Sequence, residues 1–214
     1  MVGVTEQIEA VRRRVGRRAD EGRELRLLTL EQDLPASPDD LWAAITTAKR
    51  LPRWFLPVTG DLRAGGRFQL EGNAAGTIER CDPGASFRST WEFGDAIGWI
   101  EVAVAAGDDR GARLTLTHLS GLDDATWTEY GPGATGVGWD LSLLGLALHL
   151  APGGADDPAE ARAWAGEEDG GRFIELSGEA WYAADVVGGA DWAEARTRAD
   201  RTIAAYTAPV DDED

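Results

Sequence analysis

The spacing of hydrophobic residues changes several times along the chain, and each spacing predicts a different element. In residues 5–18, Ile8, Val11 and Val15 recur every three or four positions among five arginines, which predicts a short basic amphipathic helix. Between Leu25 and Leu34, hydrophobic and polar residues alternate instead, as they do in a strand with one buried face.

A helix is predicted to begin at Ser37. The Ser37 hydroxyl can cap the first turn, Pro38 suits the first helical position, and Asp39 and Asp40 favour the positive end of the helix dipole. A second short helix is expected over residues 48–53.

Alternation dominates residues 65–119. About five alternating segments follow one another, separated by turns rich in Gly, Asp and Pro. Short turns between successive strands predict an antiparallel meander. Two of its faces consist of Phe87, Ser89, Trp91 and Phe93, and of Leu114, Leu116 and His118.

Residues 137–150 are apolar almost all round, so the helix predicted there must be covered on most sides. Gly136, Gly138 and Gly145 lie in or beside it, which indicates either close packing or space left for a bound molecule. Further helices are predicted around Trp164, over residues 173–187, and over residues 192–206 with Asp191 as the cap.

Several short motifs together carry a family resemblance. They are LPASPDDLWAAIT (residues 34–46), LPRWF (51–55), GGRF (65–68), GTI (76–78), TWE (90–92) and RLTLTH (113–118). This set resembles the START-like (SRPBCC) superfamily and, within it, the group named after the activator of Hsp90 ATPase homologue 1 (AHSA1-like). The stretch from Trp127 to Asp140 is similar to the start of the final helix in actinobacterial members.

The resemblance implies an α+β helix-grip fold, in which a curved antiparallel sheet surrounds a long helix near its C-terminal side, with extra C-terminal helices added here. The predicted organisation is a basic N-terminal helix (1–24), a START-like helix-grip domain (25–151), a helical extension (152–206) and an acidic tail (207–214).

Charge narrows the range of partners. The 214 residues include 21 Lys and Arg against 38 Asp and Glu, a net charge of −17 that disfavours nucleic acids and anionic membranes. Residues 155–214 carry −11, whereas residues 1–26 carry +2. The basic N-terminal segment is therefore expected to neutralise the acidic C-terminal part, within one chain or in a homodimer.

Cysteine usage and hydropathy indicate the compartment. Cys81 is the sole cysteine, so neither an intramolecular disulfide nor a four-cysteine zinc site can form. No uninterrupted apolar run approaches the roughly 20 residues of a membrane span, and no apolar leader opens the chain. We therefore expect a cytoplasmic protein that does not enter a membrane.

The sequence offers little catalytic material. With two histidines, one cysteine and no metal-ligand or phosphate-loop spacing, neither a metal nor a cofactor is predicted. His118 is the candidate acid–base group because alternation places it on the inner face. The simpler interpretation, which we favour, is a strand-end histidine satisfied by backbone or water. Glu92, Glu101, Glu129 and Asp140 are expected on the surface, as caps or in salt bridges.

The resemblance also implies an elongated cavity between the sheet and the final helix, which superfamily members use to bind lipids, sterols, polyketides or plant hormones. We expect this chain to bind a small hydrophobic ligand there, unless its aromatic rings fill the space. The alternatives are a cavity enzyme of cyclase or dehydratase type that uses His118, and a co-chaperone-like module that binds a protein partner. The expected pocket residues are Trp42, Trp54, Phe68, Trp91, Phe93, His118, Trp127, Trp139 and Leu143.

Overall fold

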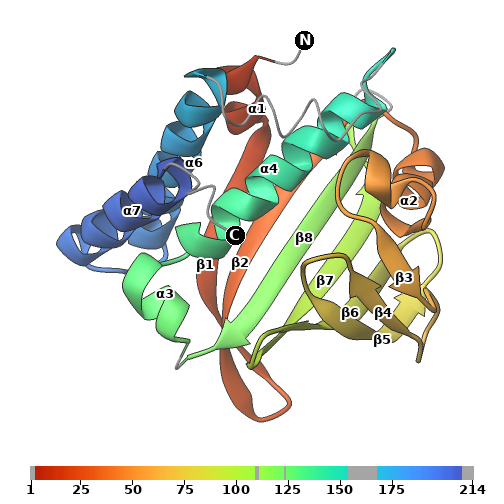
Figure 1. The fold of residues 1–214 in the computed structure, drawn as a ribbon, viewed down its shortest axis with the longest axis horizontal. Coiled ribbons are helices and arrows are strands. Elements are labelled where there is room, and N and C mark those ends of the chain that lie inside the picture. Colours follow the sequence, from red (N-terminus) through yellow and green to blue (C-terminus); the bar gives the residue numbers. More distant parts are fainter. Residues whose placement is uncertain (1–2, 109–110, 123, 154–167, 209–214) are drawn as a thin grey trace, which may run out of the picture.

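A computed structural model describes residues 3–108, 111–122, 124–153 and 168–208. One eight-stranded antiparallel sheet, in the order β1-β2-β8-β7-β6-β5-β4-β3, curves around helix α4 (Figure 1). The strands are β1 Val11–Asp20, β2 Arg23–Leu34, β3 Val58–Gly60, β4 Arg67–Leu70, β5 Ala75–Asp82, β6 Ser86–Phe93, β7 Ala96–Ala106 and β8 Ala112–Gly121. The helices are α1 Val4–Ala10, α2 Pro38–Thr46, the 3₁₀ turn η1 Leu51–Arg53, α3 Ala125–Tyr130, α4 Gly133–Leu150, α6 Glu168–Val187 and α7 Trp192–Thr207. This is the predicted α+β helix-grip fold.

Most of the arginine-rich residues 5–18 belong to strand β1, so the prediction of a helix through residue 18 is wrong. Only Val4–Ala10 is helical, and β1 then pairs with β2 from Val11 opposite Gln32 to Asp20 opposite Arg23. Glu21 and Gly22 both adopt positive φ, at 47° and 81°, as a two-residue hairpin turn requires. Pairing with β2 along the whole of β1 outweighs the helical spacing of three apolar residues.

The predicted start of α2 and the antiparallel meander are confirmed. Ser37 caps α2, its side chain accepting a hydrogen bond from the backbone N–H of Asp40. Strands β4 to β8 follow one another in the sheet as consecutive antiparallel neighbours. The second short helix is reduced to η1, and the three-residue edge strand β3 was not predicted.

Helix α4 is covered on several sides, as its almost wholly apolar surface demands. The sheet lies under one side, and α6 packs against both α4 and β1 (Figure 1). The glycines of α4 serve this packing. A Cβ at Gly136 would overlap the indole of Trp181 on α6, and one at Gly145 would collide with the backbone carbonyl of Trp54.

The C-terminal helices α6 and α7 form an antiparallel pair beside α4 (Figure 1). Asp191 caps α7, accepting hydrogen bonds from the backbone N–H groups of Ala193 and Glu194. The helix predicted around Trp164 and the end of the acidic tail lie outside the described residues.

The arginines of β1 find partners other than those predicted. Arg12 pairs with Glu31 and Asp33 on β2, Arg13 with Asp140 on α4, and Arg18 with Glu101 on β7. For these three arginines the expected neutralisation of the acidic C-terminal part is wrong. Strand β1 packs closely against α6, and Gly188, the residue directly after α6, lies against Val15 of β1.

Candidate ligand-binding cavity

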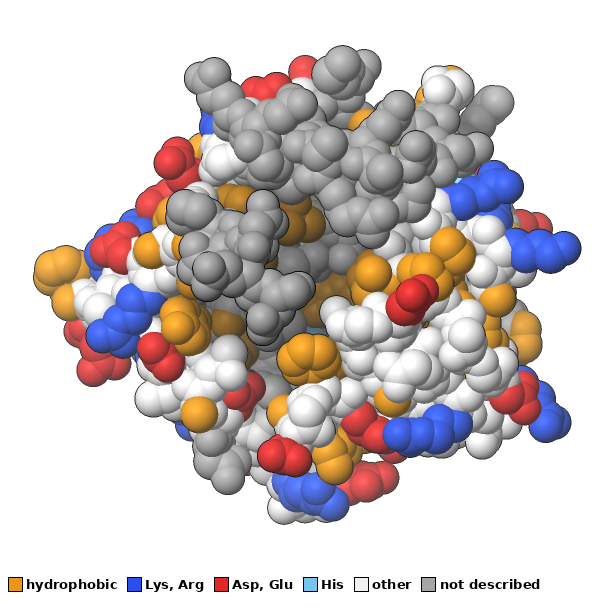
Figure 2. Space-filling model, viewed as in Figure 1, with side chains coloured by type: hydrophobic (Ala, Val, Ile, Leu, Met, Phe, Trp, Pro, Cys, Tyr) orange, Lys and Arg blue, Asp and Glu red, His pale blue; other side chains and the backbone are white. Residues whose placement is uncertain are grey.

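An apolar cavity of about 430 Å³ lies between α4, α2, η1 and the concave face of the sheet. Figure 2 shows that the face carrying α4 is hollowed and that hydrophobic side chains border the hollow. The sheet contributes Val58, Phe68, Leu70, Ile78, Phe87, Ser89, Trp91, Ile100, Val102, Leu114 and Leu116 to the wall. The helices and η1 with its flank contribute Trp42, Ile45, Thr46, Leu51, Trp54, Phe55, Trp139, Ser142 and Leu143.

The structure brings six of the nine predicted pocket residues together in this wall. They are Trp42, Trp54, Phe68, Trp91, Trp139 and Leu143. Strand alternation places Phe68 and Trp91 on the concave face, and helical spacing places Trp139 and Leu143 on the side of α4 that faces the sheet. Residues far apart in the chain therefore converge because the sheet curves around α4.

The aromatic rings line the cavity without filling it. Phe55 stacks on Trp54 with ring centroids 5.5 Å apart and on Trp139 at 6.0 Å, while Trp91 lies 5.2 Å from Trp139. These spacings are typical of favourable aromatic pairs. The Trp54 indole N–H is also fixed, since it donates to the carbonyl of Ala44 at 3.1 Å. The rings thus support one another as a wall and leave open volume beside them.

Two predicted pocket residues, Phe93 and Trp127, lie elsewhere. Phe93 ends β6 at the hairpin turn, and 59% of it is exposed because the strand there has passed beyond the covering helices. Trp127 is buried on α3, where the guanidinium of Arg26 lies 5.2 Å from its ring centroid. The prediction that these two line the cavity is wrong.

His118 faces inward as alternation predicted, but it is not part of the cavity wall. Its ring centroid lies 6.2 Å from those of both Trp91 and Trp139, and its Nδ1 accepts a hydrogen bond of 3.2 Å from Nε1 of Trp139. Burial lowers the pKa of His118 to about 4. With Nδ1 engaged and so low a pKa, the ring is a weak general base, and its evident role is to hold Trp139.

Asp140 is buried, which contradicts the expectation of a surface carboxylate. Its side chain is fully enclosed and pairs with Arg13 at 3.0 Å. Ser177 and Trp181 of α6 donate further hydrogen bonds to it, at 2.5 and 2.9 Å. Burial raises the pKa of Asp140, while the Arg13 charge opposes that rise. The carboxylate thereby ties β1, α4 and α6 together.

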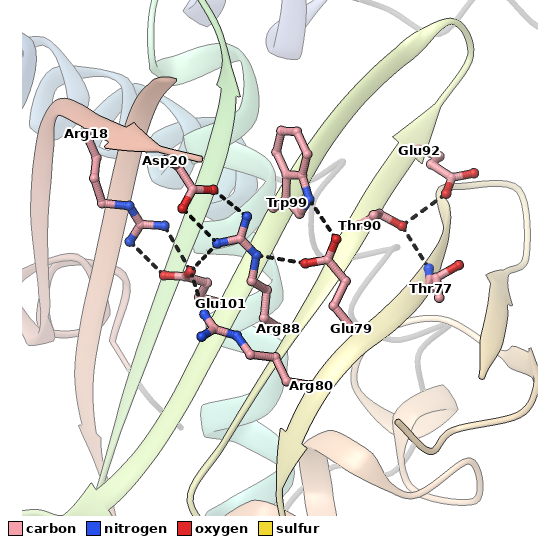
Figure 3. Close-up of polar contacts among 10 residues, drawn as sticks. All are labelled: Arg18, Asp20, Thr77, Glu79, Arg80, Arg88, Thr90, Glu92, Trp99 and Glu101. Atoms are coloured by element: carbon pink, nitrogen blue, oxygen red, sulfur yellow. Dashed lines mark hydrogen bonds and ion pairs between the residues drawn. The ribbon is translucent and has the colours of Figure 1, made fainter. Parts of the chain in front are cut away.

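The other carboxylates lie on the outside of the fold. Glu92 pairs with Arg67 at 2.6 Å, and Glu129 is exposed. Glu101 belongs to a network on the convex face of the sheet (Figure 3), in which the Arg88 guanidinium bonds Asp20, Glu79 and Glu101. Hydrogen bonds from arginines lower the pKa values of Asp20, Glu92 and Glu101. None of these groups is a wall residue of the cavity.

Across the ranges the structure describes, no cluster of three or more His, Cys, Asp or Glu side chains could hold a metal ion. No helix among those residues has the length and apolar character needed to cross a membrane.

Pattern reasoning missed part of the wall. Phe55, Leu51 and Ile45 come from the helical segment before the meander, where no alternation identifies the inward side. Ser89 is different, because its position between Phe87 and Trp91 on one strand face was visible in the sequence. A single hydroxyl within an otherwise apolar inner face is the signal that could have identified it.

Comparison with known protein families identifies the family to which this chain is related. The model of the family described as Activator of Hsp90 ATPase homolog 1-like protein (AHSA1) matches residues 35–151, more than half of the chain. The chain belongs to the AHSA1 family. The matched region runs from the start of α2 to the end of α4, so it contains every described residue that lines the cavity.

Solved structures extend the likeness beyond that region. The crystal structure of CalU16 from Micromonospora echinospora is 31% identical, with 82% of this chain and 98% of that chain covered and a TM-score of 0.65. The solution NMR structure of CalU16 is 30% identical, with coverage of 84% and 97% and a TM-score of 0.70. The similarity to CalU16 therefore includes elements outside residues 35–151.

A more distant structure shares the fold alone. DynU16, described as a putative protein in the dynemicin biosynthetic locus, is 16% identical, with 61% of this chain and 49% of that chain covered and a TM-score of 0.54. A comparison with curated proteins gave no match.

Proposed function

We propose that this AHSA1-family protein binds a small, largely apolar molecule in the cavity between the sheet and α4. The observation that carries the proposal is the cavity itself, about 430 Å³ in volume with a wall that is almost entirely aliphatic and aromatic. That volume lies within the usual range of small-molecule sites, and such sites are mostly apolar with few polar groups.

Packing energetics support an occupant. Side chains around an empty apolar cavity lose the dispersion contacts that a filled interior supplies, which costs stability in proportion to the cavity volume. Trp42, Trp54, Trp91 and Trp139 would recover such contacts against a bound apolar molecule. Catalysis has weaker support, since His118 is engaged by Trp139 and stands outside the wall.

The test is native mass spectrometry of the protein isolated from its own host. Leu143→Trp should fill the cavity from α4, and Val187→Trp adds the same bulk at a residue that is 89% exposed. We expect wild type and Val187→Trp to carry a co-purified molecule and Leu143→Trp to lack it. Leu116→Phe serves as a second filled variant if Leu143→Trp does not fold.

Two outcomes contradict the proposal. One is a wild-type protein without any bound molecule that also fails to bind added apolar probes. The other is a folded Leu143→Trp protein that retains the molecule at the wild-type level. Recovery of the same protein partner with all three chains would instead support the surface-interaction hypothesis. We also propose that the protein binds this ligand in the cytoplasm. With Cys81 as its only cysteine, the chain needs no oxidising compartment to form an intramolecular disulfide.

A further inference from the structure

Ser89 is a hydroxyl set among apolar side chains of the cavity wall. It lies on β6 between Phe87 and Trp91, with which it shares the concave face. Its cross-strand partners are Ile78 on β5 and Ile100 on β7, and both also line the cavity. Hydrophobic side chains therefore surround this hydroxyl along its own strand and on both neighbouring strands.

The hydroxyl of Ser89 is also unsatisfied. The residue is 0% exposed, and its Oγ has no hydrogen-bond partner among the residues that the structure describes. Other polar groups of the wall differ in this respect. Ser142 donates to the carbonyl of Gly138 at 2.8 Å, and Thr46 donates to that of Trp42 at 2.7 Å. Buried polar groups are normally paired, so an unpaired one calls for a partner that the protein itself does not supply.

The charges of the wall define the ligand further. Arg63 is the only Lys, Arg, Asp, Glu or His among the described lining residues. Its side chain is 81% exposed and already pairs with Asp61 at 2.6 Å. An ionised ligand would lose its hydration in this cavity without gaining a buried counter-charge, which is strongly unfavourable. The wall therefore favours a neutral molecule.

From these observations we infer that the ligand is uncharged and carries a carbonyl or hydroxyl oxygen that forms a hydrogen bond with Ser89. This inference rests on the proposed function. It adds the chemical class of the ligand, a neutral apolar skeleton with an oxygen directed at β6, and it makes Ser89 the residue that selects for that oxygen.

The test uses matched probes that differ by one carbonyl. They are 9-fluorenone with fluorene, and the more flexible benzophenone with diphenylmethane. Quenching of the wall tryptophans reports binding. We expect wild type to bind each ketone about fivefold to tenfold more tightly than its hydrocarbon, the effect of one net hydrogen bond. Fluorene-9-carboxylate, a charged analogue, should bind at least tenfold more weakly than 9-fluorenone.

Two variants assign the preference to Ser89. Ser89→Ala should bind ketone and hydrocarbon equally, with its affinity for the hydrocarbon kept. Ser142→Ala, which removes a wall hydroxyl that is already bonded to Gly138, should keep the wild-type preference. Ser89→Ala removes an unpaired group and adds no bulk, so it should unfold at or above the wild-type temperature.

The outcomes separate this inference from the proposed function. Equal binding of ketone and hydrocarbon by wild type, or a preference that survives in Ser89→Ala, would overturn the role of Ser89 and leave apolar binding intact. Tight binding of the carboxylate would overturn the neutral class. Failure of wild type to bind any of the four neutral probes would count against both.

Discussion

Nε1 of Trp139 donates a hydrogen bond of 3.2 Å to Nδ1 of His118, which joins α4 to β8 beside the cavity. The bond requires Nδ1 to be free of a proton, so the neutral ring carries its proton on Nε2. Protonation of the ring would abolish this acceptor and release Trp139. The wall of the cavity therefore depends on a neutral His118.

The pKa of His118 predicts how stability depends on pH. Burial lowers it from about 6.5 to about 4, so below pH 6.5 the unfolded chain takes up a proton that the folded chain does not. The stability that the neutral His118 ring contributes to the folded state is complete above pH 6.5 and is lost as the pH falls toward 4. Between pH 7 and pH 5 we expect wild type to lose about 1–2 kcal/mol more unfolding free energy than His118→Asn, measured in urea.

The Asn variant is the suitable comparison because its side-chain oxygen can still accept from Trp139 without titrating. It should therefore match wild type at pH 7 to within about 1 kcal/mol, whereas His118→Leu should be less stable by about 1–2 kcal/mol because the indole N–H loses its acceptor. Identical pH dependence in wild type and His118→Asn would show that His118 does not carry this effect.

The buried pair of Arg13 and Asp140 gives a second prediction. The guanidinium makes further hydrogen bonds to the carbonyls of Ile8 and Val11, and only 5% of its side chain is exposed. Arg13→Met or Asp140→Asn alone should each cost about 3–5 kcal/mol, since each leaves a buried partner uncompensated. The double variant should cost at least 2 kcal/mol less than the sum, as measured by a urea double-mutant cycle. Additivity within about 0.5 kcal/mol would contradict the coupling.

Residue spacing and capping patterns predicted much of this fold. They failed where a residue's structure or burial depends on a partner far away in the chain. Ser37 caps α2 through a contact three residues away, so sequence proximity was enough. Val11 and Val15 fit a helical face as well as a strand face, and only pairing with β2 selects the strand. Asp140 resembled a surface carboxylate because its partner Arg13 is 127 positions away in the chain.

The same distinction holds for the cavity. Alternation correctly assigned Trp91 to the concave face, but it assigned Phe93 there too, because a pattern does not show where the covering helices end. It also placed His118 inward without showing that Trp139, from α4, would occupy its Nδ1. Which side a residue faces follows from its own strand, whereas what it meets there depends on elements folded over it.

The convex-face network predicts a third, pH-dependent effect. Arg88 joins the tip of the β1–β2 hairpin to β5 and β7, since it bonds Asp20 at 2.5 Å, Glu79 at 2.9 Å and Glu101 at 2.9 Å (Figure 3). Only 9% of the Arg88 side chain is exposed. Arg88→Met should therefore cost about 1–3 kcal/mol at pH 7, less than a fully buried pair because Asp20 and Glu101 are partly hydrated.

Acid should reduce that difference. Hydrogen bonds from Arg88 and Arg18 lower the pKa values of Asp20 and Glu101, so the stabilisation is complete above the unfolded values near 4 and is lost as the pH falls below them. Urea unfolding at pH 7 and pH 3 should show wild type and Arg88→Met converging. Arg63→Met is the control, because its pair with Asp61 is 81% and 47% exposed and should contribute little to stability at either pH. An Arg88→Met cost as small as that of the control would mean that the network does not hold the hairpin to the sheet.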